Sequence, residues 1–380
     1  MQIAGSIVLM IVSCLIIWRS ATGFEIASDY LGRKLSHGMK GATINAIASS
    51  MPEFLSSFFF LFYLKDMNGF SGGLGITAGS SIFNLLVIPA AVTLVILLRD
   101  PSKTIELTMK VLRRDGIVLI ITILILILII DRQSLRPIHG LILVLAYIVY
   151  LAYMFFSMKS LKDSIPEKPV PKHYPSQQPL PVKILTLKLE CLIVGKKELN
   201  SRNSWILLLV STLVMTLGTW LLVLGTERLS DGLHIPILFI AVVLSAAASS
   251  VPDTVISVKD ARKGNYDDAI SNALGSNIFD ISFALGLPLL IYTLMYGAIE
   301  METAVVELST ELWMFLLITT IFGAILFNIG RKLTLWKAYL FILIYLLFVL
   351  YVVGHAFQMP LTEVVSDALI GFVDWLRTLL

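Results

Sequence analysis

The stretch ASSMPEFLSS at 48–57, followed by GSSIFN at 79–84, decides the fold because the chain contains it twice. The second copy is ASSVPDTVIS at 248–257 with GSNIFD at 275–280. Pro52 aligns with Pro252 and Glu53 with Asp253 at an offset of 200 residues, whereas the later segments align at an offset of 196. The first copy therefore has four extra residues, which we place in the turn NGFSGG at 68–73. A duplication of this length indicates two related halves.

The rest of the chain is too apolar for a soluble globule. Hydrophobic residues make up 57% of the 380 residues, charged residues 14%, and the mean hydropathy is +0.86. A membrane-spanning helix needs roughly 20 apolar residues. The sequence predicts an all-α integral membrane protein with ten transmembrane helices, near 3–18, 40–64, 73–98, 116–131, 138–158, 203–226, 234–258, 269–296, 311–329 and 334–356.

A polar stretch at 159–202 contains six of the fourteen prolines and divides the spans into five and five. We interpret it as a Pro-rich cytoplasmic linker, extended over Pro166–Pro181, between a first half at 1–158 and a second half at 203–356. Because five is odd, the second half enters the membrane from the opposite side, and the halves form inverted five-helix repeats, as secondary transporters use. The cation-binding repeats are placed at about 41–90 and 241–287. Residues 357–380 predict an amphipathic helix at the outer surface, with an eleventh span as the alternative.

The basic residues predict the orientation in the membrane. The loops after the odd-numbered spans hold 24 of the 29 Lys and Arg residues. The positive-inside rule then places these loops in the cytoplasm and both termini outside. No basic residue precedes the first apolar stretch, which favours a retained span over a cleaved signal peptide. The basic residues are explained by topology, so no nucleic-acid partner is implied, and Cys14 and Cys191 do not suggest a disulfide.

Three acids fall near the middle of predicted spans, namely Glu53, Asp253 and Asp280, without a basic residue in the same span core. Charges inside a bilayer cost several kcal/mol and mark functional sites. The alternative is a set of protonated carboxylic acids that hydrogen-bond and stabilise helix packing. Three acids in repeated positions exceed what packing requires, which favours a functional role.

The residues around the acids supply further oxygen atoms. Pro52 and Pro252 each remove a helical hydrogen bond and free carbonyl groups upstream. Ser80 and Asn84 lie four residues apart, as do Ser276 and Asp280, so each pair shares one helix face. Hydroxyl oxygens come from Ser49, Ser50, Ser249 and Ser250. Such a set suits hard cations such as Ca²⁺ and Na⁺, whereas zinc and copper prefer His or Cys ligands, and no cofactor is implied.

At these residues the chain resembles the calcium/cation antiporter superfamily, that is, the sodium/calcium exchangers. That family has a small-Ser/Thr-Ser-x-Pro-acid motif and a Gly-Ser-x-x-Phe-Asn/Asp motif in each of two inverted repeats. The resemblance is strong over about 70 residues of this chain and elsewhere rests on span count and topology. Its second repeat is closer to the potassium-dependent branch, because Asp280 is acidic.

The resemblance implies a role for each matching residue. Glu53 and Asp253 would be the principal Ca²⁺ carboxylates, and Asn84 and Asp280 would complete the ring. Na⁺ sites would be lined by Ser50, Ser80, Ser250 and Ser276 with the carbonyls of Ala46 and Ala246. The chain departs from the family pattern at Ala48 and Ala248, where glycine is usual, at Ser81, where asparagine is usual, and at Asp253, where glutamate is commoner.

The function expected from these features is exchange of Na⁺ for Ca²⁺ by alternating access, with spans one and six sliding near 23–29 and 225–231. The alternatives are H⁺/Ca²⁺ antiport and K⁺-dependent Na⁺/Ca²⁺ exchange. A cation channel would use the same acids in an open pore. An intramembrane aspartyl protease is a further alternative, but the Tyr-Asp and Gly-x-Gly-Asp settings are absent around Asp253 and Asp280. The absence of a fused domain suggests a microbial plasma membrane, and the oligomeric state is left open.

Overall fold

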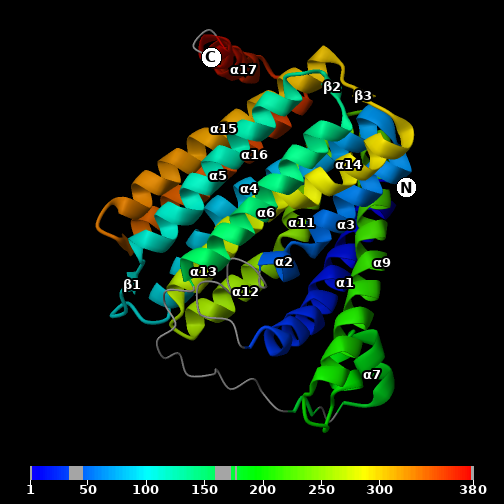
Figure 1. Ribbon diagram of the computed structural model, residues 1–380, viewed down its shortest axis with the longest axis vertical. Coiled ribbons are helices and arrows are strands. Elements are labelled where there is room, and N and C mark those ends of the chain that lie inside the picture. The colour runs from blue at the N-terminus through cyan, green and yellow to red at the C-terminus, as the bar shows by residue number, and fades with distance from the viewer. Residues whose placement is uncertain (1, 34–45, 159–172, 176–177, 378–380) are drawn as a thin grey trace.

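The computed structural model of the chain describes residues 2–33, 46–158, 173–175 and 178–377 and is almost entirely helical (Figure 1). Within these ranges the only strands are four pairs of residues. β1 (Ile105–Glu106) is antiparallel to β4 (Lys332–Leu333), and β2 (Ser134–Leu135) is antiparallel to β3 (Ile299–Glu300). These short pairings tie loops together at the ends of the helices.

The long helices form one bundle, which confirms an all-α membrane protein. Eight helical stretches of the described residues are long and apolar enough to cross a bilayer: Ile3–Leu31, Met67–Leu97, Pro137–Met154, Ser201–Leu233, Ile237–Arg262, Tyr266–Tyr296, Thr303–Asn328 and Leu335–Ala356. The helices are α1 (Gln2–Leu31), α2 (Ala46–Ser49), α3 (Met51–Phe59), α4 (Asp66–Leu97), α5 (Met109–Ile130), α6 (Pro137–Met158), α7 (Leu180–Leu185), α8 (Leu189–Ile193), α9 (Ser201–Leu233), α10 (Ile237–Ile240), α11 (Ala246–Ser249), α12 (Val251–Arg262), α13 (Tyr266–Phe279), α14 (Leu285–Tyr296), α15 (Thr303–Asn328), α16 (Leu335–Ala356) and α17 (Pro360–Arg377), with π-helical turns η2 (Phe60–Leu64), η4 (Ala241–Ser245) and η5 (Asp280–Ala284).

The count of ten spans stays a prediction. One of the two remaining expected spans is represented by the shorter apolar helix Met51–Leu64, preceded by residues outside the described ranges. The other is α5, which carries Arg113, Arg114 and Asp115 near its start. Nevertheless α5 runs from the β1 pairing to the β2 pairing, as α15 runs from β3 to β4. Because α15 is long enough to span, α5 bridges the same two ends of the bundle.

Helices α1 and α9 extend beyond the spans expected near 3–18 and 203–226. α1 continues past Arg19 to Leu31, and α9 continues to Leu233. Thirty residues of helix measure about 45 Å, longer than a hydrocarbon core of about 30 Å. Both helices therefore carry polar residues beyond their apolar stretches.

Helices α1 and α9 pack on each other through glycines and lie side by side in Figure 1. A Cβ atom on Gly23 of α1 would meet the Ser211 side chain of α9. One on Gly225 of α9 would lie 2.8 Å from Cγ of Met10 on α1. Small residues that let helix backbones approach are the usual basis of packing between membrane helices. The pair α1–α9 therefore behaves as one packing unit.

Helix α4 runs through the centre of the bundle. Its side chains at Leu74, Ala78 and Ile82 are at most 1% exposed. On its other side a Cβ atom on Gly79 would clash with the Val242 carbonyl and would lie 2.6 Å from Cβ of Ala246. The glycine of the first GSSIFN segment therefore allows α4 to touch the backbone of the second half.

Further helices lie before and after the second half. Within the expected linker, 159–172 and 176–177 lie outside the described residues. The described part is not extended throughout, because α7 begins at Leu180 and α8 packs Leu189 and Val194 against Leu207 of α9. At the other end, α17 lies across the ends of α15 and α16 (Figure 1). Its Ser366 hydroxyl donates to Glu311 Oε1 of α15 at 2.6 Å.

We predict that Gly79→Val destabilises the protein. The added isopropyl group has no room between α4 and the backbone at Val242, and overpacking of this kind costs about 1–3 kcal/mol. The expected result is a lower thermal unfolding midpoint in detergent, followed by tryptophan fluorescence. Gly116→Ala on α5 is the control, because a Cβ atom there meets nothing within 4 Å. Equal midpoints for the two variants would contradict this account of Gly79.

Candidate cation-binding site

Each half has a helix that is interrupted just before its proline. Ser50 separates α2 from α3, and Ser250 separates α11 from α12. At both serines the backbone leaves α-helical geometry, with ψ of 7° at Ser50 and 0° at Ser250. Glu53 and Asp253 consequently lie in the first turn of a new helix. The unpaired N–H groups and the dipole at a helix start favour a negative charge there.

The two alanine carbonyls in the preceding turns are engaged. Ala46 O accepts from Ser50 N at 2.9 Å and from Ser49 Oγ at 3.3 Å. Ala246 O accepts from Ser250 N at 3.0 Å and from Ser249 Oγ at 3.1 Å. The two halves repeat this pattern bond for bond. As these bonds stand, both lone pairs of each carbonyl are used within its own turn.

Asp253 is surrounded by groups from both halves. Its Oδ1 accepts from Ser276 Oγ at 2.6 Å, and its Oδ2 accepts from Asn84 Nδ2 at 3.4 Å. Ser49 Oγ lies 3.3 Å from Ser276 Oγ. The side chain of Asp253 is fully buried. The structure thus brings Asn84 and Ser49 of the first half to the acid of the second half.

The arrangement around Glu53 is the counterpart. Ser250 Oγ of the second half lies 3.5 Å from Glu53 Oε1, at the limit for a hydrogen bond, and Ser249 is close by. Asp280 lies within electrostatic range of Glu53 and Asp253. Each broken-helix motif therefore presents its serines to the acid of the other half.

Asp280 stands in the first π-helical turn of η5, where α13 gives way to α14. Ser50 and Ser80 are near enough to interact with it, but neither of its carboxylate oxygens has a hydrogen-bond partner of normal geometry. The side chain is nevertheless fully buried. All twelve sequence-predicted site residues therefore lie in the two broken helices or in α4 and α13–η5, the helices that pack against them.

The buried polar atoms without partners in these segments are all oxygens. They are Glu53 Oε2, both Asp280 oxygens, Asn84 Oδ1, Asn277 Oδ1, Thr77 Oγ1 and the hydroxyls of Ser50, Ser56, Ser57 and Ser81. A buried polar group without a partner costs free energy, and more if it is charged. Hard cations take carboxylate, amide and hydroxyl oxygens as ligands. The donor set therefore fits a cation substrate rather than an anion.

The acids do not form a compact carboxylate cage. Among the described residues, no three His, Cys, Asp or Glu side chains lie together as metal ligands. Oxygens from serine and asparagine separate the carboxylates instead. A site of mixed neutral and charged ligands holds an ion less tightly than a carboxylate cage, as a transported ion requires.

Sequence reasoning missed several polar residues near the site. Asn272 Nδ2 donates to Ser257 Oγ at 3.1 Å and lies 3.5 Å from the Asp253 carbonyl oxygen. Asn277 Nδ2 donates to the Ser81 carbonyl at 2.9 Å and so links α13 to α4. Asn272 lies four residues before Ser276 and Ser257 four after Asp253. Extension of the predicted helix faces by one turn would have identified Asn272 and Ser257.

Buried charges elsewhere in the bundle have partners. Asp115 accepts from Arg114 Nε at 2.6 Å and from Ser271 Oγ at 2.6 Å. Glu311 accepts from Tyr351 Oη at 2.5 Å as well as from Ser366. Lys337 Nζ donates to the Leu326 carbonyl at 2.7 Å at the end of α15, where a helix favours a cation. These groups hold helices together, and their hydrogen-bond partners distinguish them from Glu53 and Asp280.

The fold and the duplicated buried oxygens define a helical membrane protein of two related halves with a polar centre. The family model described as sodium/calcium exchanger protein matches residues 5–156 and 203–354. The chain belongs to this family. The two matched segments correspond to the two halves recognised in the sequence.

Several curated relatives share part of the chain. The sodium/potassium/calcium exchanger Nckx30C of Drosophila melanogaster is 40% identical over 80 residues, which are 21% of this chain and 9% of that protein. Human sodium/potassium/calcium exchanger 3 is 35% identical over 116 residues, 30% of this chain and 18% of that protein. The putative antiporter CaxA of Alkalimonas amylolytica is 25% identical over 288 residues, 75% of this chain and 80% of the relative. The chain thus spans less than a fifth of the two animal exchangers.

Solved structures show the same fold. The H⁺/Ca²⁺ exchanger CAX superposes with a TM-score of 0.62 at 14% identity, over 98% of this chain and 91% of that chain. The sodium-calcium exchanger NCX_Mj, soaked with 100 mM Na⁺ and 10 mM Sr²⁺, gives a TM-score of 0.56 at 21% identity, over 91% and 97%. At these identities the similarity establishes the fold alone.

We predict that Ca²⁺ stabilises the folded protein and that this effect requires Glu53. A ligand at 100 times its Kd contributes about 2.7 kcal/mol, which corresponds to a thermal midpoint higher by a few degrees. Glu53→Gln should abolish the increment. Glu311→Gln, a buried carboxylate outside the site, is the matched control and should keep the increment even if its starting midpoint is lower. A Ca²⁺ effect that survives in Glu53→Gln would remove this residue from the site.

Proposed function

We propose that the protein is a secondary antiporter that exchanges Na⁺ for Ca²⁺ across a membrane by alternating access. The observation that supports this proposal most directly is the set of buried oxygens without hydrogen-bond partners around Glu53, Asp253 and Asp280. The names of the relatives, sodium/potassium/calcium exchangers and a putative antiporter, support the same class. The Tyr-Asp and Gly-x-Gly-Asp settings of an intramembrane aspartyl protease are absent around Asp253 and Asp280, which favours a transporter over an enzyme.

The proposed ligands are the twelve residues named from the sequence. Ca²⁺ is held by the carboxylates of Glu53 and Asp253, with Asn84 and Asp280 beside them. Na⁺ takes the serine hydroxyls of both motifs and the carbonyls of Ala46 and Ala246. For these two carbonyls to bind Na⁺, the hydroxyls of Ser49 and Ser249 have to rotate away from them. The bonds within each turn are long enough, at 3.3 and 3.1 Å, for such an exchange of partners.

Electrostatics couples the two fluxes. An empty site carries up to three negative charges in a dry environment, and the cost of moving it through the barrier prevents the empty protein from changing state. One Ca²⁺ or two or more Na⁺ neutralise most of that charge. Because both ions need the same oxygens, they occupy the site in turn, which is the condition for exchange rather than leak.

The proposed architecture is ten transmembrane helices in two inverted five-helix repeats. The first half is 1–158, the second is 203–356, and 159–202 is a cytoplasmic linker. Residues 357–380 form an amphipathic helix at the outer surface, and in α17 exposed Leu361, Val364 and Val365 give a face suited to the lipid interface. Both termini are then outside, and a microbial plasma membrane is the proposed location.

The deciding experiment measures ⁴⁵Ca²⁺ uptake into proteoliposomes that is driven by an outward Na⁺ gradient. Glu53→Gln and Asp253→Asn each remove a Ca²⁺ ligand and should lower uptake more than about tenfold, the equivalent of about 1.4 kcal/mol. Glu311→Gln serves as the control. Full exchange in either site variant would discard the assignment.

The same vesicles identify the coupling ion. Uptake driven by a pH gradient and not by Na⁺ would replace the proposal with H⁺/Ca²⁺ antiport. Uptake that needs K⁺ on the side of Ca²⁺ would place the chain with K⁺-dependent exchange, for which Asp280 supplies an extra negative charge. Ca²⁺ movement without counter-transport would indicate a channel.

A further inference from the structure

Helices α1 and α9 contain a second duplication. The pattern Trp-x4-Gly-x-Glu-x2-Ser-Asp occurs in both, at an offset of 202 residues. Its two copies are Trp18, Gly23, Glu25, Ser28 and Asp29 in α1, and Trp220, Gly225, Glu227, Ser230 and Asp231 in α9. The glycines are those that pack α1 against α9. The glutamates are therefore equivalent positions on one two-helix unit.

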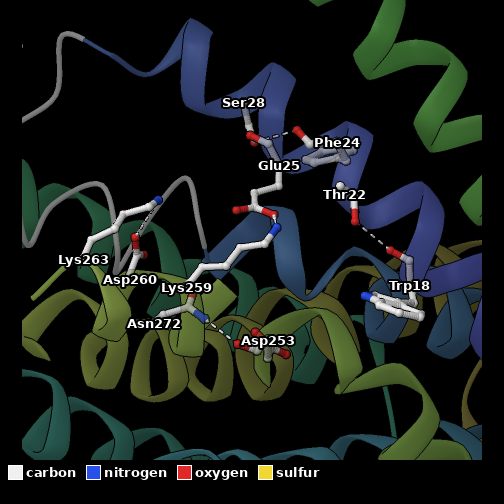
Figure 2. Close-up of polar contacts among 10 residues, drawn as sticks. All are labelled: Trp18, Thr22, Phe24, Glu25, Ser28, Asp253, Lys259, Asp260, Lys263 and Asn272. Carbon is white, nitrogen blue, oxygen red and sulfur yellow. Dashed lines mark hydrogen bonds and ion pairs between the residues drawn. The ribbon is translucent and has the colours of Figure 1, made fainter. Parts of the chain in front are cut away.

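The two glutamates meet different surfaces. Glu25 Oε2 lies 2.7 Å from Lys259 Nζ on α12, as Figure 2 shows. The Glu25 side chain is 13% exposed and that of Lys259 is 39% exposed. Lys263, one turn further along α12, also lies within electrostatic range of Glu25, but its Nζ lies 3.6 Å from Asp260 Oδ1 instead. The ion pair between Glu25 and Lys259 thus joins the α1–α9 unit to the helix that carries Asp253.

The equivalent contact in the first half contains no lysine. At the offset of 200 residues, Lys259 corresponds to Phe59 and Lys263 to Tyr63. Both aromatic rings pack edge-on against Trp220 of α9, with centroids 5.3 and 4.8 Å away. One end of the α1–α9 unit is therefore held by a charge pair and the other by aromatic packing, together with a contact between the Tyr63 hydroxyl and Glu227.

The ion pair lies beyond Asp253 on a polar route out of the site. Six residues of helix separate Asp253 from Lys259, or about 9 Å along the axis. Between them Ser257 of α12 bonds to Asn272 of α13, and both side chains are fully buried. In the first half the residue that aligns with Asn272 is Ile76, which packs with Phe60 in an apolar cluster. Hydroxyl and amide groups thus lead from Asp253 toward the end of the molecule at which Lys259 lies.

Both acids are sealed from solvent in this structure, since Glu53 and Asp253 are each 0% exposed. Cation access at the Lys259 end requires α1 to separate from α12. Pro252, Val255 and Ile256 of α12 line one small pocket together with Trp18, Ala21 and Thr22 of α1. Beside this pocket the ion pair of Glu25 and Lys259 provides a specific attraction between α1 and α12.

We propose that Glu25 and Lys259 form the gate at one end of the cation path, closed when the pair is made and opened when α1 moves away from α12. On the topology predicted from the basic residues, this end is cytoplasmic. The proposal rests on the exchange function above for its biological meaning. If the ion pair is lost, the Asp253 end of the site becomes accessible to solvent and the Glu53 end stays closed.

Cysteine labelling tests the gate without any ion gradient. In a full-length background with Cys14→Ser and Cys191→Ser, reporter cysteines are introduced by Ser257→Cys or by its counterpart Ser57→Cys. The rate of reaction with a small cationic methanethiosulfonate is measured in detergent. Lys259→Glu places two acids together, and should raise the rate at position 257 about three- to tenfold, as expected for loss of a partly exposed charge pair. The rate at position 57 should stay unchanged.

Two further variants decide the interpretation. The charge swap Glu25→Lys with Lys259→Glu should restore slow labelling at position 257, and Lys263→Glu, the matched control, should leave it slow. Acceleration by Lys263→Glu, acceleration at position 57, or failure of the swap to restore slow labelling would each overturn the gate. If Ser257→Cys does not give a monodisperse protein, Val255→Cys at the α1–α12 contact replaces it. Because no transport is measured, the outcome does not depend on whether the protein exchanges Na⁺ for Ca²⁺.

Discussion

The structure depends on the cost of charge in an environment without water. Glu53, Asp253 and Asp280 are buried in a bundle that the bilayer surrounds, and no lysine or arginine of the described residues is bonded to them. An isolated ionised carboxylate in such surroundings is too costly to persist without a counterion. The helix starts at Ser50 and Ser250 and the serines that cross from one half to the other reduce this cost in part. On the proposed function, a bound cation offsets the remainder.

The same principle separates functional from structural charges. Asp115, Glu311 and Lys337 are also buried, yet each is bonded to groups that satisfy it. In a sequence these residues look as exceptional as Glu53, since all are charges near apolar stretches. Only the three-dimensional arrangement shows that their hydrogen bonds are complete. A search for intramembrane charges therefore finds all of these residues, and the missing hydrogen-bond partners set Glu53 and Asp280 apart from Asp115, Glu311 and Lys337.

Much of this could be predicted from the sequence, because membrane helices and internal duplication leave local patterns. The motifs around Pro52 and Pro252 located the broken helices, and the family resemblance implied one site that contains Asp253, Ser276 and Asn84. The full lengths of α1 and α9 were not predicted, because only their apolar stretches near 3–18 and 203–226 have the composition of a membrane span. Polar residues after these stretches are compatible with a helix that extends beyond the hydrocarbon core. The pairing of Glu25 with Lys259 could not be predicted, since it depends on how one pair of helices lies against the others.

The exchange of ligands between the halves has a consequence for the origin of the chain. Ser250 lies beside Glu53 and Asn84 beside Asp253, so each half supplies polar groups to the acid of the other half, although Ser276 of the second half also bonds to Asp253. A protein of half this length would have had a complete site only as a pair of molecules. Gene fusion would then have kept such a pair together and allowed its members to diverge, as the lysine at 259 and the phenylalanine at 59 have done.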